Sequence, residues 1–505
     1  MSLGTGSGLT VGGDGNSRAD DRLSAVAVAS ALRERVVQMF NKVLVANRGE
    51  IAVRIFRALK EMSISSVAVH ARDDTGSLHT RMADESHEMS QSIGSAAYLD
   101  IDAVLDLAQQ VGADAIHPGY GFLAENATFA GRCADLGITF IGPPADAIAR
   151  MARKTQARKI MNEAGVPVIP GTLHPITGAA EAAAAARSIG FPVAVKAAAG
   201  GGGKGFRVAR DVTELPSALA GAADEGRRFF GDESVYLERY FEDPRHVEVQ
   251  ILADEFGDVV HLGERDCSVQ RRHQKLIEEA PGPVVDPSLR AMMGEVAVEA
   301  ARAVGYRGAG TVEGLLHDGS YYFMEMNTRI QVEHGVTEAV TGIDIVKEGI
   351  RIAAGEPLSF RQDDVEFRGH AIECRINAED AARNFLPAPG RIETYRAPSG
   401  PGVRVDSGVE AGSEVLPSYD SMIAKLIVWD RTRHDATLRM IRALDEFSIT
   451  GVRTLIPFHR ALLHTKQWES GETCRGLIGD KAWLRATQVT PGGGSPVVDG
   501  GGRDG

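Results

Sequence analysis

Short apolar runs alternate with longer amphipathic stretches along most of this 505-residue chain. A short apolar run bounded by polar residues is typical of a strand, whereas apolar residues at every third or fourth position indicate a helix. Strands and helices in alternation predict a parallel, doubly wound sheet with helices on both faces. We expect this arrangement in the first third of the chain, with strands Lys42–Ala46, Ser66–His70, Ala115–His117 and Ile138–Ile141 and helices Ile51–Glu61, Ile101–Val111 and Ala147–Ala164.

The pattern changes in the rest of the chain. A small α+β unit is expected next, with strands Val193–Ala197, Phe206–Ala209 and Val235–Tyr240 and helix Leu215–Phe229. From Phe241 onward strands dominate, and the sequence ends in a β-rich part followed by a helix. The strands expected there are His246–Ala253, Val259–Glu264, Gly310–Leu316, Tyr321–Met326 and Gly369–Ile376, and the helices are Ser288–Val304, Ile345–Ala354 and Thr432–Glu446. The whole chain is predicted to be an α/β protein.

The segment from Glu325 to His334 places polar side chains directly after an apolar strand. Alternate residues of an extended chain share a face, so Glu325 and Asn327 point the same way. Polar groups at the end of a buried strand indicate a site, and their oxygen atoms suit a hard cation such as Mg²⁺. If the chain stays extended, the same face also carries Arg329, Gln331 and Glu333.

Composition and charge exclude some classes of protein. The chain is 43% apolar and 24% charged, as in ordinary globular proteins. Its formal net charge of −13 argues against a general nucleic-acid binder, whose surface would be basic. No apolar run is long enough to span a bilayer, so no membrane is expected as a partner. The cysteines show neither zinc-ligand spacing nor a disulfide framework, which favours a cytoplasmic location; they are Cys133, Cys267, Cys374 and Cys474.

Both ends of the chain have the composition of disordered segments. Residues 1–40 are rich in Gly, Ser and Asp and then in Ala and Arg, and they lack the features of a signal peptide. Residues 486–505 are rich in Gly and Pro. We expect the folded protein to begin near Met39.

Two segments indicate phosphate and cation binding. Four consecutive glycines, Gly200–Gly203, lie between Lys196 and Lys204, so bare backbone amides and a cation are available to a polyphosphate; a flexible linker is the alternative. Glu313 lies in an apolar strand whose expected hairpin partner carries Glu325. A buried lone carboxylate is costly unless it is paired or binds a cation, although a half-solvated strand would also explain Glu313.

Three further segments each leave two interpretations open. The loop that follows the strand ending at His117 lies where open α/β sheets place ligands, but a structural loop is equally compatible. The charged segment Glu264–Lys275 fits a local anion pocket or a solvated surface, and Cys267 within it is interpreted as structural. Arg375 follows an apolar strand and forms either part of a site or an ion pair with Glu373.

Taken together, these segments resemble the biotin carboxylase family of the ATP-grasp superfamily. The resemblance runs from about Lys42 to about Leu463, and several signatures in the same order make it specific. The signatures are ANRGEIAVRIFRA (46–58), HPGYGFLAEN (117–126), KAAAGGGGKG (196–205), PRHVEVQ (244–250), ERDCSVQRRHQK (264–275), GYRGAGTVE (305–313), MEMNTRIQVEH (324–334) and ECRINAED (373–380).

The resemblance implies a biotin carboxylase, which uses ATP, bicarbonate and protein-linked biotin to make ADP, phosphate and carboxybiotin. It implies Glu333 as the general base, Arg375 as the group that stabilises the biotin enolate, and Arg329 and Lys275 as further catalytic residues. It also implies Mg²⁺ or Mn²⁺ held by Glu313, Glu325 and Asn327. Bicarbonate would contact Lys275, Arg329, Gln331 and Val332, and biotin would contact Tyr120 and Arg375. ATP would contact Lys154, Lys196, Glu238, Arg239, Tyr240, Phe241, His246, Gln270 and His273, with Gly202 and Gly203 in a lid that closes over its phosphates.

The chain departs from the family pattern at a few positions. Gly335 follows His334 where the family usually has Pro, which frees the backbone beside Glu333. Gly314 replaces a bulkier residue next to a metal ligand, and Leu455 stands where Asn is common. A homodimer is expected, because four residues match the family's dimer contacts: Arg54, Arg57, Glu61 and Arg404. Pro401 does not match the aromatic residue that is usual at its position.

The sequence has no Met-Lys-Met biotin-attachment site. We therefore expect a separate biotin carboxylase subunit of an acyl-CoA carboxylase, active in fatty acid metabolism, with a biotin carboxyl carrier protein and a carboxyltransferase as partners. The alternatives are a pyruvate carboxylase-type enzyme, another ATP-grasp ligase that joins a carboxylate to an amine, and an inactive scaffold subunit. The expected divisions are 1–40 (extension), 41–152 (N-terminal domain), 153–240 (lid), 241–370 (ATP-grasp core), 371–485 (C-terminal domain) and 486–505 (tail).

Overall fold

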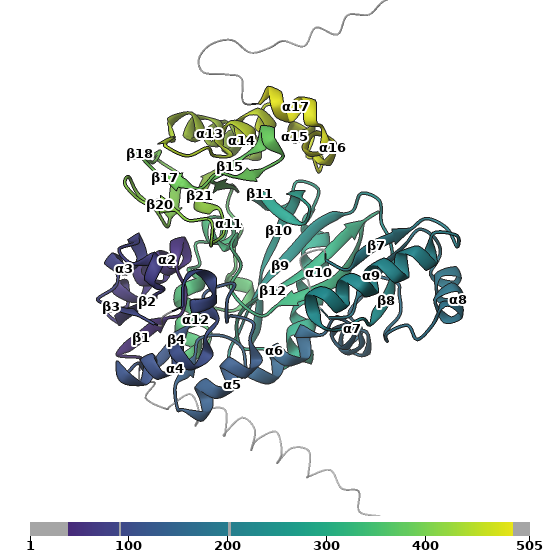
Figure 1. The fold of residues 1–505 in the computed structure, drawn as a ribbon, viewed down its shortest axis with the longest axis horizontal. Helices are drawn as coiled ribbons and strands as arrows, with labels where there is room; N and C mark the ends of the chain where they lie inside the picture. Colours follow the sequence, from purple (N-terminus) through teal and green to yellow (C-terminus); the bar gives the residue numbers. More distant parts are fainter. Residues whose placement is uncertain (1–38, 90–91, 200–203, 488–505) are drawn as a thin grey trace, which may run out of the picture.

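The first sheet along the chain is parallel, as the alternating pattern predicts. The structure is a computed structural model that describes residues 39–89, 92–199 and 204–487. Five strands pair in the order β3-β2-β1-β4-β5, and helices cover both faces (Figure 1). The strands are β1 Lys42–Val45, β2 Ser65–His70, β3 Glu85–Glu88, β4 Ala115–His117 and β5 Thr139–Phe140. The helices are α2 Gly49–Glu61, α3 Leu78–Met82, α4 Ile101–Gln110 and α5 Ala127–Asp135.

The helix expected over Ala147–Ala164 is wrong as a single element. The structure has α6 Ala145–Ala152 and α7 Lys154–Glu163, because Arg153 is extended with φ −97° and ψ 111°. This break sets Lys154 at the first position of α7, where its ammonium group contacts Glu325. The amphipathic pattern alone does not reveal a one-residue interruption of this kind.

A small three-stranded antiparallel sheet forms the second unit. Its strands pair in the order β7-β6-β8, and helices α8 and α9 pack against it (Figure 1). The glycines of the expected loop tip, Gly200–Gly203, lie outside the described residues. The elements are β6 Val193–Ala197, β7 Phe206–Ala209, β8 Val235–Arg239, α8 Ala179–Ile189 and α9 Leu215–Phe230.

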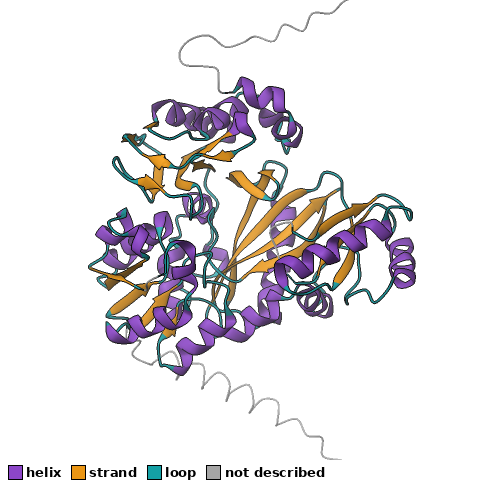
Figure 2. Ribbon diagram, in the orientation of Figure 1, coloured by secondary structure: helices purple, strands orange, loops and turns teal. Residues whose placement is uncertain are grey.

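An eight-stranded sheet connects the remaining parts of the chain, and its long strands are prominent in Figure 2. The strand order is β13-β12-β9-β10-β11-β14-β21-β19, and every pairing is antiparallel. The strands are β9 Arg245–Ala253, β10 Val259–Arg271, β11 Gln274–Ala280, β12 Gly308–His317, β13 Ser320–Asn327, β14 His370–Asn377, β19 Val403–Ser407 and β21 Met422–Asp430.

Helices and short strands complete the fold around this sheet. α10 Pro287–Ala303 packs on β9 and β10, and α11 His334–Thr341 with α12 Ile345–Ala353 follows β13. The C-terminal helices pack on the β14–β21 end of the sheet; they are α13 Arg433–Glu446, α14 Ile456–Leu463, α15 Lys466–Glu469, α16 Arg475–Gly479 and α17 Lys481–Ala486. The short strands are β15 Glu379–Asp380, β16 Leu386–Pro387, β17 Gly390–Arg391, β18 Thr394–Arg396, β20 Glu414–Val415 and β22 Ser448–Thr450.

Strand β10 is longer than the sequence predicts, and β11 was not predicted. The expected strand ends at Glu264, but β10 continues through the charged residues to Arg271. The strand tolerates these charges because partners on neighbouring elements neutralise them: Arg265 Nε lies 2.6 Å from Glu248 Oε1, and Arg290 Nε lies 2.7 Å from Glu264 Oε2. Burial of paired charges is acceptable where burial of single charges is not.

The predicted fold class is confirmed, with a parallel N-terminal sheet and a largely antiparallel second half. The disordered extension and tail predicted from composition lie almost wholly outside the described residues. The domain divisions remain predictions. None of the helices within the described ranges has the length and apolar character needed to span a membrane.

Candidate active site

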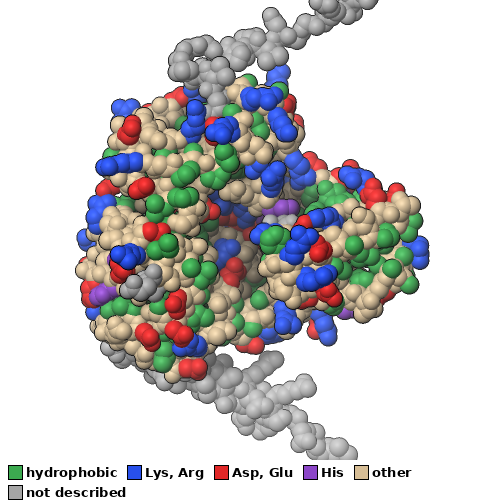
Figure 3. Space-filling view, viewed as in Figure 1, with side chains coloured by type: hydrophobic (Ala, Val, Ile, Leu, Met, Phe, Trp, Pro, Cys, Tyr) green, Lys and Arg blue, Asp and Glu red, His purple; other side chains and the backbone are tan. Residues whose placement is uncertain are grey.

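A cleft of about 1170 Å³ lies between the three sheets. Figure 3 shows it as a hollow in the face of the molecule, with basic, acidic and histidine side chains exposed inside it. Residues from all three units line the cleft. They include these predicted site residues: Tyr120, Lys154, Lys196, Glu238, Arg239, Tyr240, Phe241, His246, Gln270, His273, Lys275, Glu313, Glu325, Asn327, Arg329, Gln331, Val332 and Arg375.

Among the predicted site residues that the structure describes, Glu333 alone does not line the cleft. Gly202 and Gly203 lie outside the described residues. Glu333 lies beneath the floor of the cleft, fully buried. Two cationic side chains that line the cleft, Lys275 and Arg375, contact Glu333 directly.

The β12–β13 hairpin sets two carboxylates side by side at the floor of the cleft. Glu313 and Glu325 are directly opposite each other in the antiparallel register, as the sequence predicts. Asn327 closes the group, since its Nδ2 donates to Glu313 Oε1 at 2.7 Å. Two carboxylates and an amide oxygen on one face form the donor set that Mg²⁺ prefers.

Lysine ammonium groups contact the same carboxylates in the structure. Lys154 Nζ donates to Glu325 Oε2 at 2.5 Å, and Lys275 Nζ donates to Glu313 Oε1 at 3.0 Å. His246 Nε2 lies 3.0 Å from Glu313 Oε2. Positive charge therefore compensates both carboxylates, the buried Glu313 and the half-buried Glu325, and their chemistry fits a divalent cation.

The segment after β13 does not stay extended, so the condition for Arg329, Gln331 and Glu333 to share a strand face with Glu325 is not met. The strand ends at Asn327, and Glu333 is the N-cap residue of α11, with φ −82° and ψ 13°. The turn nevertheless gathers the polar side chains. Arg329 Nη1 donates to Gln331 Oε1 at 3.0 Å, and Gln331 Nε2 donates to Glu313 Oε1 at 2.8 Å.

Glu125 fixes the first part of this turn. Its two carboxylate oxygens accept from the Thr328 amide at 3.1 Å and from Arg329 Nε at 3.0 Å. Glu125 belongs to the loop that follows β4, so the N-terminal unit orients a cation of the cleft floor. Within that loop the family resemblance assigned a role only to Tyr120, so this role of Glu125 was missed.

Glu333 is held ionised by cations on three strands. Lys275 Nζ donates to Glu333 Oε1 at 2.6 Å, and Arg375 Nη2 donates to Glu333 Oε2 at 2.9 Å. Burial opposes ionisation, but Lys275, Arg375 and Arg265 outweigh it and hold the pKa of the Glu333 carboxyl well below its usual range. Any ligand that draws these cations away will raise that pKa and make Glu333 a stronger base.

Arg375 does not pair with Glu373, so that alternative is wrong. Its Nε donates to Glu278 Oε1 at 2.6 Å, and the two carboxylate oxygens of Glu373 have no hydrogen-bond partner among the described residues. Burial raises the pKa of Glu373 well above its usual value, which favours the neutral form of that side chain. Arg375 is thus a cation of the cleft, shared between Glu278 and Glu333.

Another part of the cleft lining contains a buried carboxylate and a group of aromatic rings. Glu238 accepts from Arg158 Nη1 at 2.5 Å and from Lys196, which lies at the end of β6. The ring of Phe206 lies 5.9 Å from the His273 ring and 6.3 Å from the Tyr240 ring. Such a combination of a lysine and flat apolar surfaces suits a nucleotide.

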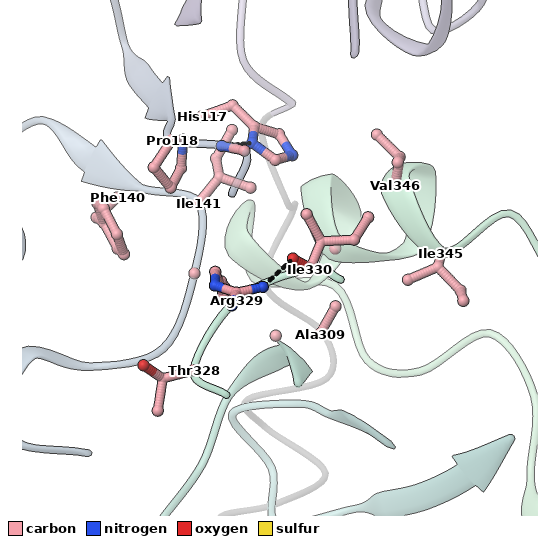
Figure 4. Close-up of a pocket in the computed structure, with 14 residues that line it drawn as sticks. His117, Pro118, Phe140, Ile141, Ala309, Thr328, Arg329, Ile330, Ile345 and Val346 are labelled. Carbon is pink, nitrogen blue, oxygen red and sulfur yellow. Dashed lines mark hydrogen bonds between the residues drawn. The ribbon is translucent and has the colours of Figure 1, made fainter. Parts of the chain in front are cut away.

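A second, much smaller cavity lies behind Arg329 (Figure 4). Its volume of about 20 Å³ accommodates a water molecule and no substrate. The Gly119 amide donates to His117 Nδ1 at 3.0 Å beside it, and burial together with Arg54 lowers the pKa of His117 to about 3. His117 is therefore a neutral structural residue, while Tyr120 of the same loop lines the main cleft and donates to Glu50.

Several buried charged residues of the site were not assigned a role from the sequence. These residues are Arg158, Glu248, Arg265, Glu278 and Lys425. Arg158 lies on helix α7, and the other four lie in strands, where only the sheet register shows which residues are their neighbours. Charged residues alternating with apolar ones inside strands were the available signal. For example, Lys425 is fully buried in β21 and donates to the Val332 carbonyl at 2.6 Å.

Comparison with protein families agrees with the fold. Three family models match in order: "Biotin carboxylase, N-terminal domain" over residues 39–148, "Carbamoyl-phosphate synthase L chain, ATP binding domain" over 153–361 and "Biotin carboxylase C-terminal domain" over 373–480. Together they define an ATP-grasp ligase. The chain belongs to the biotin carboxylase family.

Curated relatives support the same conclusion. The chain is 54% identical to Biotin carboxylase 1 of Bacillus subtilis over 86% of this chain and 97% of the relative. It is also 54% identical to a pyruvate carboxylase subunit of Methanothermobacter thermautotrophicus, over 86% of this chain and 88% of the relative.

Solved structures with this fold include enzymes with bound ligands. The chain is similar to the biotin carboxylase domain dimer of Hydrogenobacter thermophilus 2-oxoglutarate carboxylase, with MgADP and bicarbonate, at 49% identity and a TM-score of 0.84 over 86% of this chain and 96% of that one. It is also similar to biotin carboxylase from Campylobacter jejuni with a nucleotide, at 45% identity and a TM-score of 0.84 over 86% of this chain and 98% of that one. Membership of this family makes the chain an ATP-dependent ligase that uses biotin held on a carrier protein.

Proposed function

We propose that this chain carboxylates carrier-bound biotin in the cleft, as the biotin carboxylase subunit of an acyl-CoA carboxylase. One observation carries the assignment of the cleft. Lys275 bridges Glu248, Glu313 and Glu333, with Nζ–Oε distances of 2.5 Å, 3.0 Å and 2.6 Å. A cation in contact with a buried ionised carboxylate is the arrangement needed to hold an anion beside a base.

Bicarbonate would bind between Lys275, Arg329, Gln331 and the backbone of Val332. It is a weak nucleophile until it loses its proton, so a carboxylate must accept that proton. As Lys275 turns toward the bound anion, Glu333 loses a partner that keeps its pKa low. Glu333 then accepts the proton, and a carbonate oxygen is free to attack.

The attack would take place on the γ-phosphorus of ATP and release ADP. Lys154 and Lys196, with His246 nearby, would neutralise the phosphates, while Glu238, Arg239, Tyr240, Phe241, Gln270 and His273 would hold the rest of the nucleotide. Glu313, Glu325 and Asn327 would hold Mg²⁺ or Mn²⁺, which supplies further neutralisation of phosphate charge when bound. Gly202 and Gly203 would lie over the phosphates.

Carboxyphosphate formed in this way releases carbon dioxide and phosphate, and the ureido nitrogen of biotin then bonds to the carbon. The nitrogen would lose its proton to the phosphate released in the same step, and negative charge develops on the ureido oxygen as the proton leaves. Arg375 would stabilise that charge, and Tyr120 would contact the biotin ring. A fixed cation at the position where charge develops is an effective source of rate acceleration.

The first test is ATP hydrolysis by the purified protein. We expect turnover that depends on bicarbonate and rises when free biotin is added. Glu333→Gln removes the base and should lower turnover roughly 100-fold or more, while the dissociation constant for ATP stays unchanged. Turnover without bicarbonate dependence would contradict the assignment, and an active Glu333→Gln protein would contradict the role of Glu333.

The partner enzyme requires a separate experiment. A pyruvate carboxylase-type assembly is a second candidate, because one curated relative at 54% identity is named as part of a pyruvate carboxylase. Affinity purification of the chain from its own cells should recover a biotin carrier and a carboxyltransferase. Carboxylation of an acyl-CoA by that mixture would support the proposal, and carboxylation of pyruvate alone would replace it with the second candidate.

Homodimer formation, a cytoplasmic location and the domain divisions given above complete the proposal. Gel filtration with light scattering would measure the first, and cell fractionation would measure the second. Limited proteolysis would test the divisions at residues 152, 240, 370 and 485.

A further inference from the structure

Glu278 is a fully buried carboxylate that contacts Arg375 of the cleft and that the proposed mechanism does not use. It lies in β11, directly opposite Glu373 of β14 in the antiparallel register. Its Oε1 accepts from Arg375 Nε at 2.6 Å. Its Oε2 has no hydrogen-bond partner within the described residues. A buried oxygen left unpaired is costly, so the position calls for a functional explanation.

Arg375 is fixed by carboxylates at two of its nitrogens. Glu278 accepts from Nε at 2.6 Å, and Glu333 accepts from Nη2 at 2.9 Å. A planar guanidinium held at Nε and one Nη has its orientation determined. No hydrogen bond of Nη1 is present in the part of the chain that the structure describes, which leaves that donor available to a ligand of the cleft.

The charge on Glu278 is more easily changed than the charge on Glu333. Burial raises the pKa of Glu278 to about 7, and Arg375 opposes this effect, whereas the pKa of Glu333 is held well below its usual range. The other titratable or charged groups that influence Glu278 are Lys275 on the same strand, Glu333 at the start of α11, Glu373, Cys374 and Arg375 on β14 and Cys267 on β10.

We propose that Glu278 is a positioning residue for Arg375: it orients the guanidinium through Nε, and its protonated form releases the positive charge of Arg375 toward the ureido oxygen of biotin. This inference rests on the proposed function, since it concerns the same cleft. In the ionised form Glu278 competes with the substrate for the charge of Arg375. In the neutral form its carbonyl oxygen still accepts from Nε, so the orientation is kept while the charge is freed.

Two substitutions separate orientation from charge. Glu278→Leu removes the acceptor for Nε, so Arg375 loses its orientation. We expect the KM for free biotin to rise roughly 10- to 100-fold, with the dissociation constant for ATP unchanged. Glu278→Gln keeps an acceptor oxygen of the same shape but stays neutral at every pH. It should retain a KM within about threefold of the unchanged protein at low pH.

The pH dependence supplies a measurement that a merely structural role would not change. We measure kcat/KM for biotin in Glu278→Gln and in the unchanged protein from about pH 6 to about pH 8. At each pH the value for Glu278→Gln is divided by the value for the unchanged protein, so that shared ionisations of substrates cancel. The ratio should rise with pH, because only the unchanged protein acquires an ionised Glu278. A ratio that is constant across this range would overturn the release of charge, whether or not Glu278→Leu folds.

Glu279 offers a matched control on the same strand. It is also buried, but it points to the other face of the sheet, where it pairs with His370 at 2.8 Å and with Arg433. Glu279→Gln should change thermal stability without changing the KM for biotin or the pH ratio. An equal change of biotin KM in the Glu279 and Glu278 variants would overturn the positioning role.

Failure of this inference is distinguishable from failure of the proposed function. If the unchanged protein shows no biotin-stimulated turnover, the proposed function fails and so does the inference. If the unchanged protein is active while both Glu278 variants match it in KM and in pH ratio, the function stands and only the role of Glu278 is refuted.

Discussion

Gly335 is the residue at which the sequence departs from the family pattern closest to Glu333. It lies in the first turn of α11, and a Cβ built on it would lie 2.4 Å from Ile427 Cδ1 and 3.3 Å from Glu373 Oε2. The side chain of Ile427 therefore occupies the space that a larger residue would need. The backbone beside Glu333 is held independently, because Lys425 donates to the Val332 carbonyl at 2.6 Å.

We expect Gly335→Ala to destabilise the protein by about 1–3 kcal/mol through overpacking against Ile427. Ile427→Val removes the methyl group that the new Cβ would meet, so the double variant should recover part of this loss. Thermal denaturation of the two single variants and the double variant measures the coupling. Additive effects of the two changes would contradict the close contact.

The strand pattern of the sequence predicted most of the cleft residues, and the remaining ones became apparent only from the sheet register of the structure. Glu313 and Glu325 follow from the pattern because they lie on consecutive strands joined by a tight turn. Glu248 and Glu278 do not, because their neighbours come from strands far apart in the sequence, and only the order β9-β10-β11-β14 places them beside Lys275 and Arg375. The bent path after Asn327 also escaped prediction, since its shape depends on Glu125 in another unit.

At the scale of elements, two hairpins of the large sheet use the same kind of turn with different residues. Between β12 and β13, Asp318 and Gly319 have φ of 49° and 74°. Between β10 and β11, Arg272 and His273 have φ of 49° and 67°. Two positive φ values in a two-residue loop favour Asn or Asp followed by Gly. Arg272 and His273 are strained in that conformation, and both line the cleft.

Replacing Arg272 and His273 together by Asn and Gly should therefore stabilise the protein by about 1–2 kcal/mol. The same change should weaken ATP binding, because His273 is the proposed nucleotide contact. Thermal denaturation and titration with ATP measure the two effects. Asp318→Asn is the control, because it changes a turn that already has suitable residues and lies outside the cleft. Tighter ATP binding in the Asn-Gly variant would contradict the proposed role of His273.

At the scale of the whole molecule, substitutions at the expected dimer contacts would have different effects: some would disturb contacts within the chain, and others would affect only the association of two chains. Arg54 is nearly buried within the chain, where its Nη2 lies 2.6 Å from Asp344 Oδ1 and 3.0 Å from Glu338 Oε1. Arg404 also contacts Glu338, at 2.7 Å. A substitution at either position would disturb this internal network. Arg57, in contrast, is exposed on α2, so a change there reports on association.

We expect Arg57→Glu to produce monomers at protein concentrations where the unchanged chain is a dimer. The substitution reverses a charge, and in a two-fold symmetric interface each such change occurs twice. Light scattering after gel filtration measures the mass. Lys159→Glu changes the net charge equally on α7, where the side chain is 64% exposed, and should leave the mass unchanged. If both variants keep the mass of a dimer, Arg57 lies outside the interface, and if both dissociate, net charge rather than a specific contact governs association.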